Sequence, residues 1–221
     1  MHYQSQLLEK YNNFAKKVYP FIPFTYYWYL KRTAGNAGKS ILDLGCGWGE
    51  PMEVLQSAHH REATGVDIFP SYLSVSKKKG IYKHLIKGNI LTYQPKHKYD
   101  IVICSHVLEH LKKQDGLKVL NKIIKTANQK AIIALPVGNL PQDEYDGNTY
   151  QRHLSAWYPK DFRKKGFRVV GITPRFVFGT HDRFKDYGVF AFLLFFVAYL
   201  SQPFYSGKPE DCVYMLCAKN I

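Results

Sequence analysis

The stretch that decides the fold is Ile41-Leu42-Asp43-Leu44-Gly45-Cys46-Gly47-Trp48-Gly49-Glu50, an apolar strand that runs directly into alternating glycines. Glycine has no Cβ atom, so such a loop turns tightly and lets a ligand lie against bare backbone beside the next helix. A dinucleotide fingerprint needs a third glycine three positions after the second, and Glu50 stands there. The stretch therefore predicts a nucleotide-cofactor loop and argues against NAD.

Three further segments follow in order along the chain. Ala63–Ile68 is a short apolar run that ends in an acid, Asp67, 18 residues beyond Gly49. A carboxylate at the end of a strand can accept hydrogen bonds from both hydroxyls of a ribose. Ile86–Ile90 is a turn, and Tyr99–Leu111 reads as a buried strand, a polar corner and a helix start.

Together these segments resemble the class I S-adenosylmethionine-dependent methyltransferases over roughly residues 38 to 172. The pattern Asp-x-Gly-x-Gly-x-Gly resembles their motif I, residues 86–90 their adenine-binding turn, and residues 99–111 their motif IV region. The family more often has Asp where this chain has Asn89, although an amide oxygen still accepts from an adenine amino group. The resemblance implies S-adenosylmethionine as cofactor, S-adenosylhomocysteine as product, and these cofactor-binding residues: Asp43, Gly45, Cys46, Gly47, Gly49, Asp67, Ile68, Asn89, Ile90 and Ser105.

Seven strand-like runs set the expected fold class. They are Ser40–Leu44, Glu62–Asp67, His84–Lys87, Tyr99–Cys104, Ala131–Leu135, Phe167–Thr173 and Cys212–Lys219. Segments long enough for crossover helices, such as Gly116–Asn128, separate the first five runs. This spacing predicts an α/β, Rossmann-like doubly wound sheet with helices on both faces. The resemblance adds the strand order 3-2-1-4-5-7-6 with the last strand antiparallel.

Size and composition place limits on the architecture and the partners. The chain has 221 residues, 46% of them hydrophobic, and its formal net charge is +14. We expect one domain over 38–221 with an N-terminal cap over 1–37. The lysine clusters fit an ordinary solvated surface. Among functional alternatives, the charge favours anionic lipid or an acidic substrate over nucleic acid, because the lysine runs lack interleaved arginine and aromatic residues.

The sequence predicts a cytoplasmic protein, peripheral at a membrane if it contacts lipid. Residues 1–17 are polar and amphipathic and lack the pattern of an export signal. The cysteines lack Cys-x-x-Cys spacing, so we expect reduced apolar residues without a disulfide or a structural zinc ion. The cysteines are Cys46, Cys104, Cys212 and Cys217.

Two regions lie outside the expected common core. Tyr19–Tyr29 is an aromatic cluster that packs in the core or, as the resemblance implies, covers the cofactor and shapes the acceptor pocket. Pro174–Glu210 is an insertion between the sixth and seventh strands with an apolar run at 189–200, too short to span a bilayer. A buried helix, a homodimer contact, or peripheral membrane contact through 187–205 beside Arg183, Lys185 and Lys208 are the alternatives.

Two histidines are the candidate general bases for methyl transfer, which otherwise needs only alignment of the reactants and exclusion of water. His106 stands at the corner after the fourth strand, and His153 lies in Tyr150–Trp157. That segment resembles one that borders the acceptor in bacterial-type small-molecule and glycan-pathway methyltransferases, and a locally capped loop is the alternative. His106, Glu109 and His110 would share one face of a helix and could bind a divalent ion. Three ligands on one helix usually need a fourth group, so we expect no metal.

The sequence therefore predicts a methyltransferase that modifies O or N of a small-molecule, lipid or glycan-pathway acceptor. An RNA methyltransferase and a non-catalytic cofactor-binding partner subunit are the alternatives. The absence of an Asn-Pro-Pro-Tyr-type tetrapeptide after the fourth strand argues against methylation of DNA bases.

Overall fold

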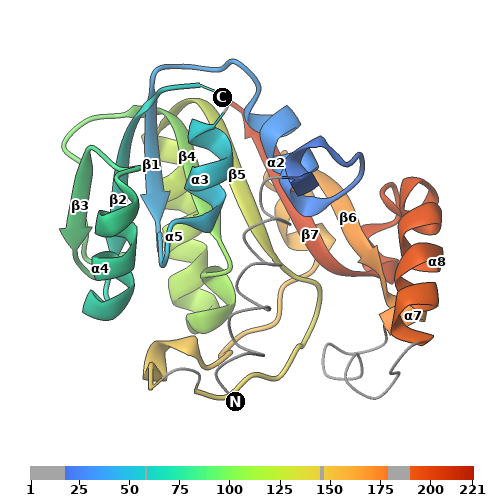
Figure 1. Ribbon diagram of the computed structural model, residues 1–221. Coiled ribbons are helices and arrows are strands. Elements are labelled where there is room, and N and C mark those ends of the chain that lie inside the picture. Colours follow the sequence, from blue (N-terminus) through green and yellow to red (C-terminus); the bar gives the residue numbers. More distant parts are fainter. Residues whose placement is uncertain (1–17, 58, 145–146, 179–189) are drawn as a thin grey trace, which may run out of the picture.

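The protein is built on a seven-stranded sheet with the order β3-β2-β1-β4-β5-β7-β6 (Figure 1). A computed structural model describes residues 18–57, 59–144, 147–178 and 190–221. All strands are parallel except β7, which runs antiparallel to both β5 and β6. The strands are β1 (Ser40–Leu44), β2 (Glu62–Asp67), β3 (His84–Lys87), β4 (Tyr99–Ser105), β5 (Ala127–Pro136), β6 (Arg168–Pro174) and β7 (Cys212–Asn220). The predicted doubly wound class, strand order and antiparallel last strand are confirmed.

Helices cover both faces of the sheet, as right-handed crossovers between parallel strands require. The helices of the crossovers and the cap are η1 (Tyr19–Phe21), α2 (Tyr26–Ala34), α3 (Glu50–Gln56), α4 (Pro70–Lys79), η2 (Leu108–His110) and α5 (Lys113–Thr126). The later helices are η3 (Thr149–Gln151), α6 (Pro159–Arg163), α7 (Arg175–Phe178), α8 (Phe190–Tyr205) and η5 (Pro209–Asp211). η1 and α2 lie within residues 1–37, for which the cap stays a prediction.

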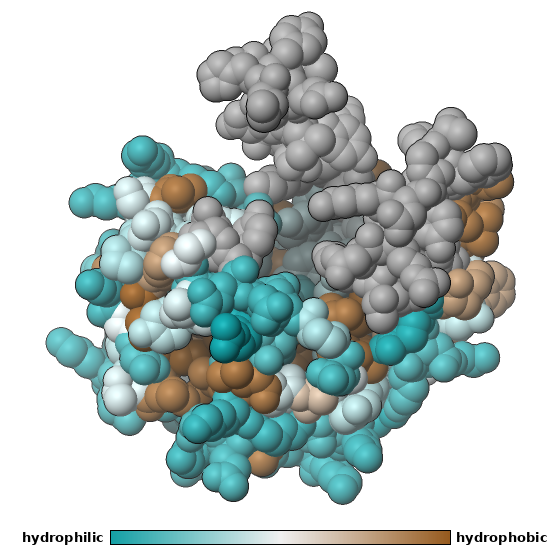
Figure 2. Space-filling view, turned by 90° about the horizontal axis from the view of Figure 1, so that it is seen from below, coloured by the Kyte–Doolittle hydropathy of each residue, from teal (hydrophilic) through white to brown (hydrophobic). Residues whose placement is uncertain are grey.

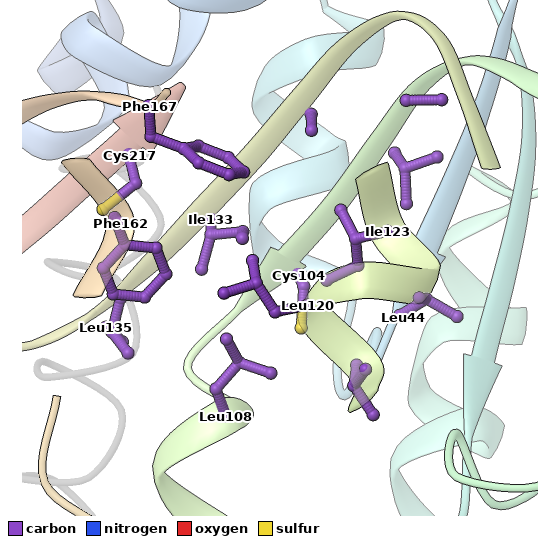
Figure 3. Close-up of a cluster of buried hydrophobic side chains, with 14 of the residues drawn as sticks. Leu44, Cys104, Leu108, Leu120, Ile123, Ile133, Leu135, Phe162, Phe167 and Cys217 are labelled. Carbon is purple, nitrogen blue, oxygen red and sulfur yellow. The ribbon is translucent and has the colours of Figure 1, made fainter. Parts of the chain in front are cut away.

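Two large hydrophobic clusters of the described residues lie on opposite faces of the sheet, and a small third one lies around Ala198 of α8. On one face, Leu120 and Ile123 of α5 pack against strand residues such as Cys104 (Figure 3). On the other face, Leu30 of α2 and Met52 of α3 pack against β1, β4 and β5. β4 is buried from both sides, so its sequence is a continuous apolar run rather than an alternating one.

Helix α5 and strand β5 both begin earlier in the chain than predicted. α5 begins at Lys113 instead of residue 116, and β5 begins at Ala127 instead of residue 131. The additional strand residues include Lys130, which pairs with Ile101 and Asn220 and whose Nζ donates to the Thr33 carbonyl at 2.6 Å. Polar side chains extend this strand beyond the apolar core, so hydrophobicity alone missed its start.

The carboxyl ends of β1, β2 and β4 meet at the lower edge of the sheet in Figure 1, and Figure 2 shows the molecule from that side. Ligands of doubly wound sheets bind outside these ends, where the strand order reverses between β1 and β4. We therefore expect a ligand-binding site among the residues that follow these strands.

The predicted insertion between β6 and β7 folds as α7, α8 and η5, and α8 packs along the edge strand β6. Gln202 ties the two together, because its Nε2 donates to the Gly171 carbonyl at 2.8 Å and its Oε1 accepts from Thr173 N–H at 2.7 Å. Within the described part of the chain, no helix has both the length and the apolar character needed to cross a bilayer. Arg183, Lys185 and residues 187–189 lie outside the described residues.

Candidate functional site

The glycine loop after β1 leaves one stretch of bare backbone open. Gly45, Gly47 and Gly49 have φ angles of +78°, +49° and +77°, a region that favours glycine. A Cβ at Gly45 would lie 2.3 Å from Val107 Cγ2, and one at Gly49 2.7 Å from Ile81 Cδ1. A Cβ at Gly47 would meet nothing within 4 Å. Gly45 and Gly49 therefore serve close packing, whereas Gly47 faces the space that a ligand would fill.

Asp67 at the end of β2 fixes this loop. Its Oδ2 accepts from Gly47 N–H at 2.8 Å, and its Oδ1 accepts from Phe69 N–H at 2.8 Å. The residue is 9% exposed. Each carboxylate oxygen has a second acceptor site, so both retain the capacity to accept from a hydroxyl.

Asp43 at the end of β1 is almost fully buried, and its Oδ2 accepts from the Tyr82 hydroxyl at 2.7 Å. Burial raises the pKa of Asp43 to about 7, although the Tyr82 hydrogen bond opposes the rise. The carboxyl group is thus poised to ionise when a cationic group is placed beside it. Tyr82 has no motif of its own, and sequence reasoning missed it.

The other predicted cofactor residues take different positions. Asn89 Oδ1 accepts from Leu91 N–H at 2.9 Å, so it closes a local turn in an exposed segment. The side chains of Cys46 and Ile90 are buried, and burial raises the pKa of the Cys46 thiol. Ile68 is half-buried beside Asp67. The contacts of these residues with a cofactor stay predictions.

Ser105, at the end of β4, connects the sheet to the N-terminal cap. The hydroxyl oxygens of Ser105 and Tyr26 lie 2.7 Å apart in a hydrogen bond. Burial raises the pKa of the Tyr26 phenol, so it stays protonated at neutral pH. α2 therefore reaches the same edge of the sheet as the glycine loop. The aromatic composition of residues 19–29 indicated a cap, but nothing local indicated this partner.

His106 occupies the corner immediately after β4. Its φ is +54°, an uncommon conformation for a residue with a side chain, and its N–H donates to the Ala134 carbonyl at 2.7 Å. Its ring lies 6.2 Å from the ring of Tyr26 and 5.6 Å from that of Tyr214, both edge-on. Its Nδ1 lies 3.4 Å from Glu109 Oε1. The imidazole is thus held among aromatic rings at the carboxyl edge of the sheet.

The prediction that His106, Glu109 and His110 share one helix face is wrong. β4 ends at Ser105, only the short 3-10 helix η2 spans Leu108–His110, and α5 begins at Lys113. The backbone explains the break, because the carbonyl of Glu109 accepts from Leu154 N–H at 2.7 Å and Ser155 N–H at 3.1 Å. A distant loop therefore binds the carbonyl that a continuing α-helix would have used.

His153 lies in that loop and packs against His110, with ring centroids 4.8 Å apart. Trp157, from the same segment, is 1% exposed, and its Nε1 donates to Ser155 Oγ at 2.9 Å. Lys113 Nζ lies 3.6 Å from the Trp157 ring centroid. Trp157 is therefore part of the core, whereas His153 belongs to a cluster with His110 and Glu109.

A large cavity opens on the β5 and β6 side of the same edge. Its volume is about 880 Å³, and no sequence motif marks it. Arg175 lies at its wall, where one guanidinium nitrogen donates to the carbonyls of Val137 at 2.8 Å and Cys212 at 3.0 Å. The lining residues are Val137, Gly138, Asn139, Tyr158, Pro159, Lys160, Arg175, Phe176, Tyr205, Glu210 and Asp211. The cavity combines aromatic rings with both signs of charge.

The part of the chain that contains the glycine loop is similar to known proteins. Residues 41–130 match the family model described as a methyltransferase domain. A ubiquinone biosynthesis O-methyltransferase of Nitrosospira multiformis is 36% identical over 95 residues, which are 38% of this chain and 37% of that protein. An uncharacterised protein of Methanocaldococcus jannaschii, MJ0638, is 26% identical over 64% of this chain and 60% of its own length. The alignments with these relatives thus span less than two thirds of each relative.

Solved structures agree on the fold. A plantazolicin methyltransferase in complex with SAH and a pentazolic analogue superposes with a TM-score of 0.56 at 16% identity, over 98% of this chain and 90% of that one. Phosphoethanolamine N-methyltransferase 2 of Haemonchus contortus gives 0.55 at 18% identity, over 87% of this chain and 50% of that one. The strand order, the open glycine loop and the family match over residues 41–130 together support a class I S-adenosylmethionine-dependent methyltransferase.

Proposed function

We propose that this protein transfers a methyl group from S-adenosylmethionine to an oxygen or nitrogen atom of a small-molecule or lipid-like acceptor. The observation that carries the proposal is the bare backbone at Gly47, held by Asp67 and open on the side where a Cβ would point. The curated relatives include ubiquinone biosynthesis O-methyltransferases, which supports an acceptor of low molecular mass.

The residues of the site divide the work of binding. Gly47 admits the cofactor close to the main chain, Asp67 accepts from its ribose hydroxyls, and Asp43 stands ready to accept from its amino group. When bound, the cofactor supplies an electrophilic methyl group on a sulfonium ion. Displacement there needs an aligned nucleophile and a dry site, and α2 with its Tyr26–Ser105 hydrogen bond supplies part of the cover.

His106 is the proposed general base. Its corner position brings the ring to the carboxyl edge between β1 and β4, and the rings of Tyr26 and Tyr214 restrict its orientation. The side chain is 43% exposed, so a reacting group can approach it. His153, the other candidate base, is proposed instead to act in the cluster that it forms with His110.

The acceptor is proposed to enter from the β5 and β6 side, through the cavity of about 880 Å³. Phe176 and Tyr205 supply ring faces with centroids 5.2 Å apart, and Lys160 and Arg175 supply positive charge. Glu210 is already occupied by a salt bridge with Arg163. This composition fits an amphiphilic acceptor with an aromatic or apolar body.

α8 supports peripheral contact with a membrane as part of the same proposal. Its described residues include an exposed apolar row at helical spacing, and hydrophobic residues gather at the right edge of the view in Figure 2. The row consists of Leu193, Phe196, Val197, Leu200 and Phe204. A net charge of +14 favours an anionic surface, and the protein would work in the cytoplasm at the membrane face. A homodimer through α8 is the competing arrangement.

The test is transfer of labelled methyl groups to metabolite and lipid extracts, with RNA as a separate substrate. We expect label in a small or lipid-soluble product, and loss of that label in Gly47→Ala. Label in RNA with a steep salt dependence would support the RNA alternative instead. Tight cofactor binding without any transfer would indicate the non-catalytic subunit.

A further inference from the structure

Three side chains outside the cofactor loop bring potential metal ligands together. Glu109 and His110 lie in η2, and His153 follows η3 in the loop after β5. One ligand atom from each residue lies within 4.8 Å of the other two. Two imidazoles and one carboxylate are a common ligand set for divalent transition metals.

The two imidazoles are oriented by backbone carbonyls through their Nδ1 atoms. His153 Nδ1 is 2.5 Å from the Leu140 carbonyl, and His110 Nδ1 is 3.3 Å from the Arg152 carbonyl. A carbonyl oxygen only accepts, so in the tautomer that makes these bonds Nδ1 is protonated and Nε2 carries the lone pair. Ligating histidines are usually held in this way, with one ring nitrogen on a carbonyl and the other on the metal.

Glu109 supplies the independent sign of a missing partner. Its side chain is 4% exposed, and its Oε2 is buried without a hydrogen-bond partner in the described structure. Its other oxygen, Oε1, faces His106 at 3.4 Å. A buried carboxylate oxygen left unpaired is costly, so its retention requires a compensating ligand. A cation held between Oε2 and the two imidazoles would supply it.

We propose that Glu109, His110 and His153 bind a divalent transition-metal ion, with zinc as the reference ion. This set replaces the helix face of His106, Glu109 and His110 that the sequence suggested, because the loop after β5 delivers His153 in place of His106. Ligand atoms about 2.0–2.1 Å from zinc lie closer together than 4.8 Å, so the side chains draw inward on binding.

The site would fasten the loop after β5 to the corner after β4. Leu154 and Ser155 already donate to the Glu109 carbonyl, and the metal would add side-chain bonds across the same junction. That junction lies next to His106 in the chain, so the ion would stabilise the corner that carries the proposed base. The binding itself does not depend on the proposed methyl transfer.

The experiment is zinc titration of the metal-stripped full-length protein in competition with a chromophoric chelator. We expect one zinc ion per chain, and at least a tenfold loss of affinity in each of Glu109→Gln, His110→Gln and His153→Gln. Such a loss is the minimum expected when a ligand is removed, since removing the supporting partners alone costs 10- to 100-fold. His84→Gln removes an exposed histidine of β3 and is the matched control with unchanged affinity.

Cobalt(II) absorption of the wild-type protein keeps the test decisive if a variant fails to fold. Visible ligand-field bands without thiolate charge-transfer bands would support the nitrogen and oxygen set. Failure of the wild type to bind zinc more tightly than His153→Gln, an equal loss in His84→Gln, or thiolate bands from the buried cysteines would each overturn the proposal.

Discussion

The two sides of the sheet's carboxyl edge differ in how they are built. On the β1 and β2 side, backbone groups meet carboxylates directly, as in the 2.8 Å bond from Gly47 N–H to Asp67. On the β5 and β6 side, a cavity of about 880 Å³ is lined by side chains from five separate segments. The first side depends on main-chain geometry, which many sequences share. The second depends on side-chain identity, which lets one fold accept different substrates.

Among tests of this difference between the two sides, Gly47→Ala is expected to have the largest effect, a loss of cofactor affinity. A methyl group there would occupy the open space and force an L residue into a left-handed conformation, so we expect cofactor affinity to fall roughly 100-fold, or about 2.7 kcal/mol. Isothermal calorimetry measures the loss. Gly80→Ala is the matched control, because Gly80 also has a positive φ of +64° and open space around its Cβ position. Equal loss of affinity in both variants would remove the special role of Gly47.

The next effect concerns Asp67. Asp67→Ala removes the proposed ribose contact and the bond that fixes Gly47, and we expect cofactor binding to weaken by about 1.5–3 kcal/mol. Asp115→Ala, which breaks only a surface pair with Lys118 on α5, should leave binding unchanged. Unaltered affinity of Asp67→Ala in calorimetry would contradict the cofactor assignment.

A smaller effect is expected from pH. Burial raises the pKa of Asp43 to about 7, so the free protein holds a proton there at pH 6 and must release it to receive a cationic amino group. Cofactor affinity should rise roughly tenfold between pH 6 and pH 8. Asp43→Asn should flatten this dependence, and a wild-type profile without any rise would refute the role.

The raised pKa of Asp43 also affects folding stability, which should fall with rising pH where cofactor affinity rises. Because the pKa of Asp43 is raised in the folded state, the native protein binds more protons than the unfolded chain between about pH 4 and pH 7. The contribution of Asp43 to stability is therefore present at the acidic end and is lost as the pH rises through about 7. Chemical denaturation of wild type and Asp43→Asn at pH 5 and pH 8 separates this contribution from the binding effect.

The smallest effect on the cofactor side is expected from α8. Phe204→Ser changes a side chain that is 78% exposed, so unfolding free energy should change by less than about 0.5 kcal/mol and cofactor affinity should stay the same. Co-sedimentation with anionic vesicles should fall, and Lys125→Ser on α5 controls for general changes at the surface. A large change in cofactor affinity would show that the two sides are not independent.

The sequence predicted the β1 to β4 half of the sheet well, because β1, β2 and β4 are apolar runs buried on both faces, and the first three strands end at Asp or are followed by Gly. It missed the polar start of β5, where Lys130 reaches Thr33 rather than the core. It also misjudged residues 106–110, since the geometry of that corner is set by Leu154 and Ser155 from far along the chain. The ring contact between His153 and His110 also depends on this distant loop, so no local sequence pattern predicts it.

The hydrogen bond between Tyr26 and Ser105 joins chain positions 79 residues apart across the edge where the cofactor is proposed to bind. The hydrophobic cluster on the face that α5 covers contains no residue of α2, whereas the cluster on the other face contains Leu30 and Ala34. Limited proteolysis between α2 and β1 should therefore impair methyl transfer more than it impairs folding of the sheet. A protein that loses α2 in this way would keep the hydrophobic cluster beneath α5, expose the strand residues that Leu30 covers, and leave the proposed site open to solvent.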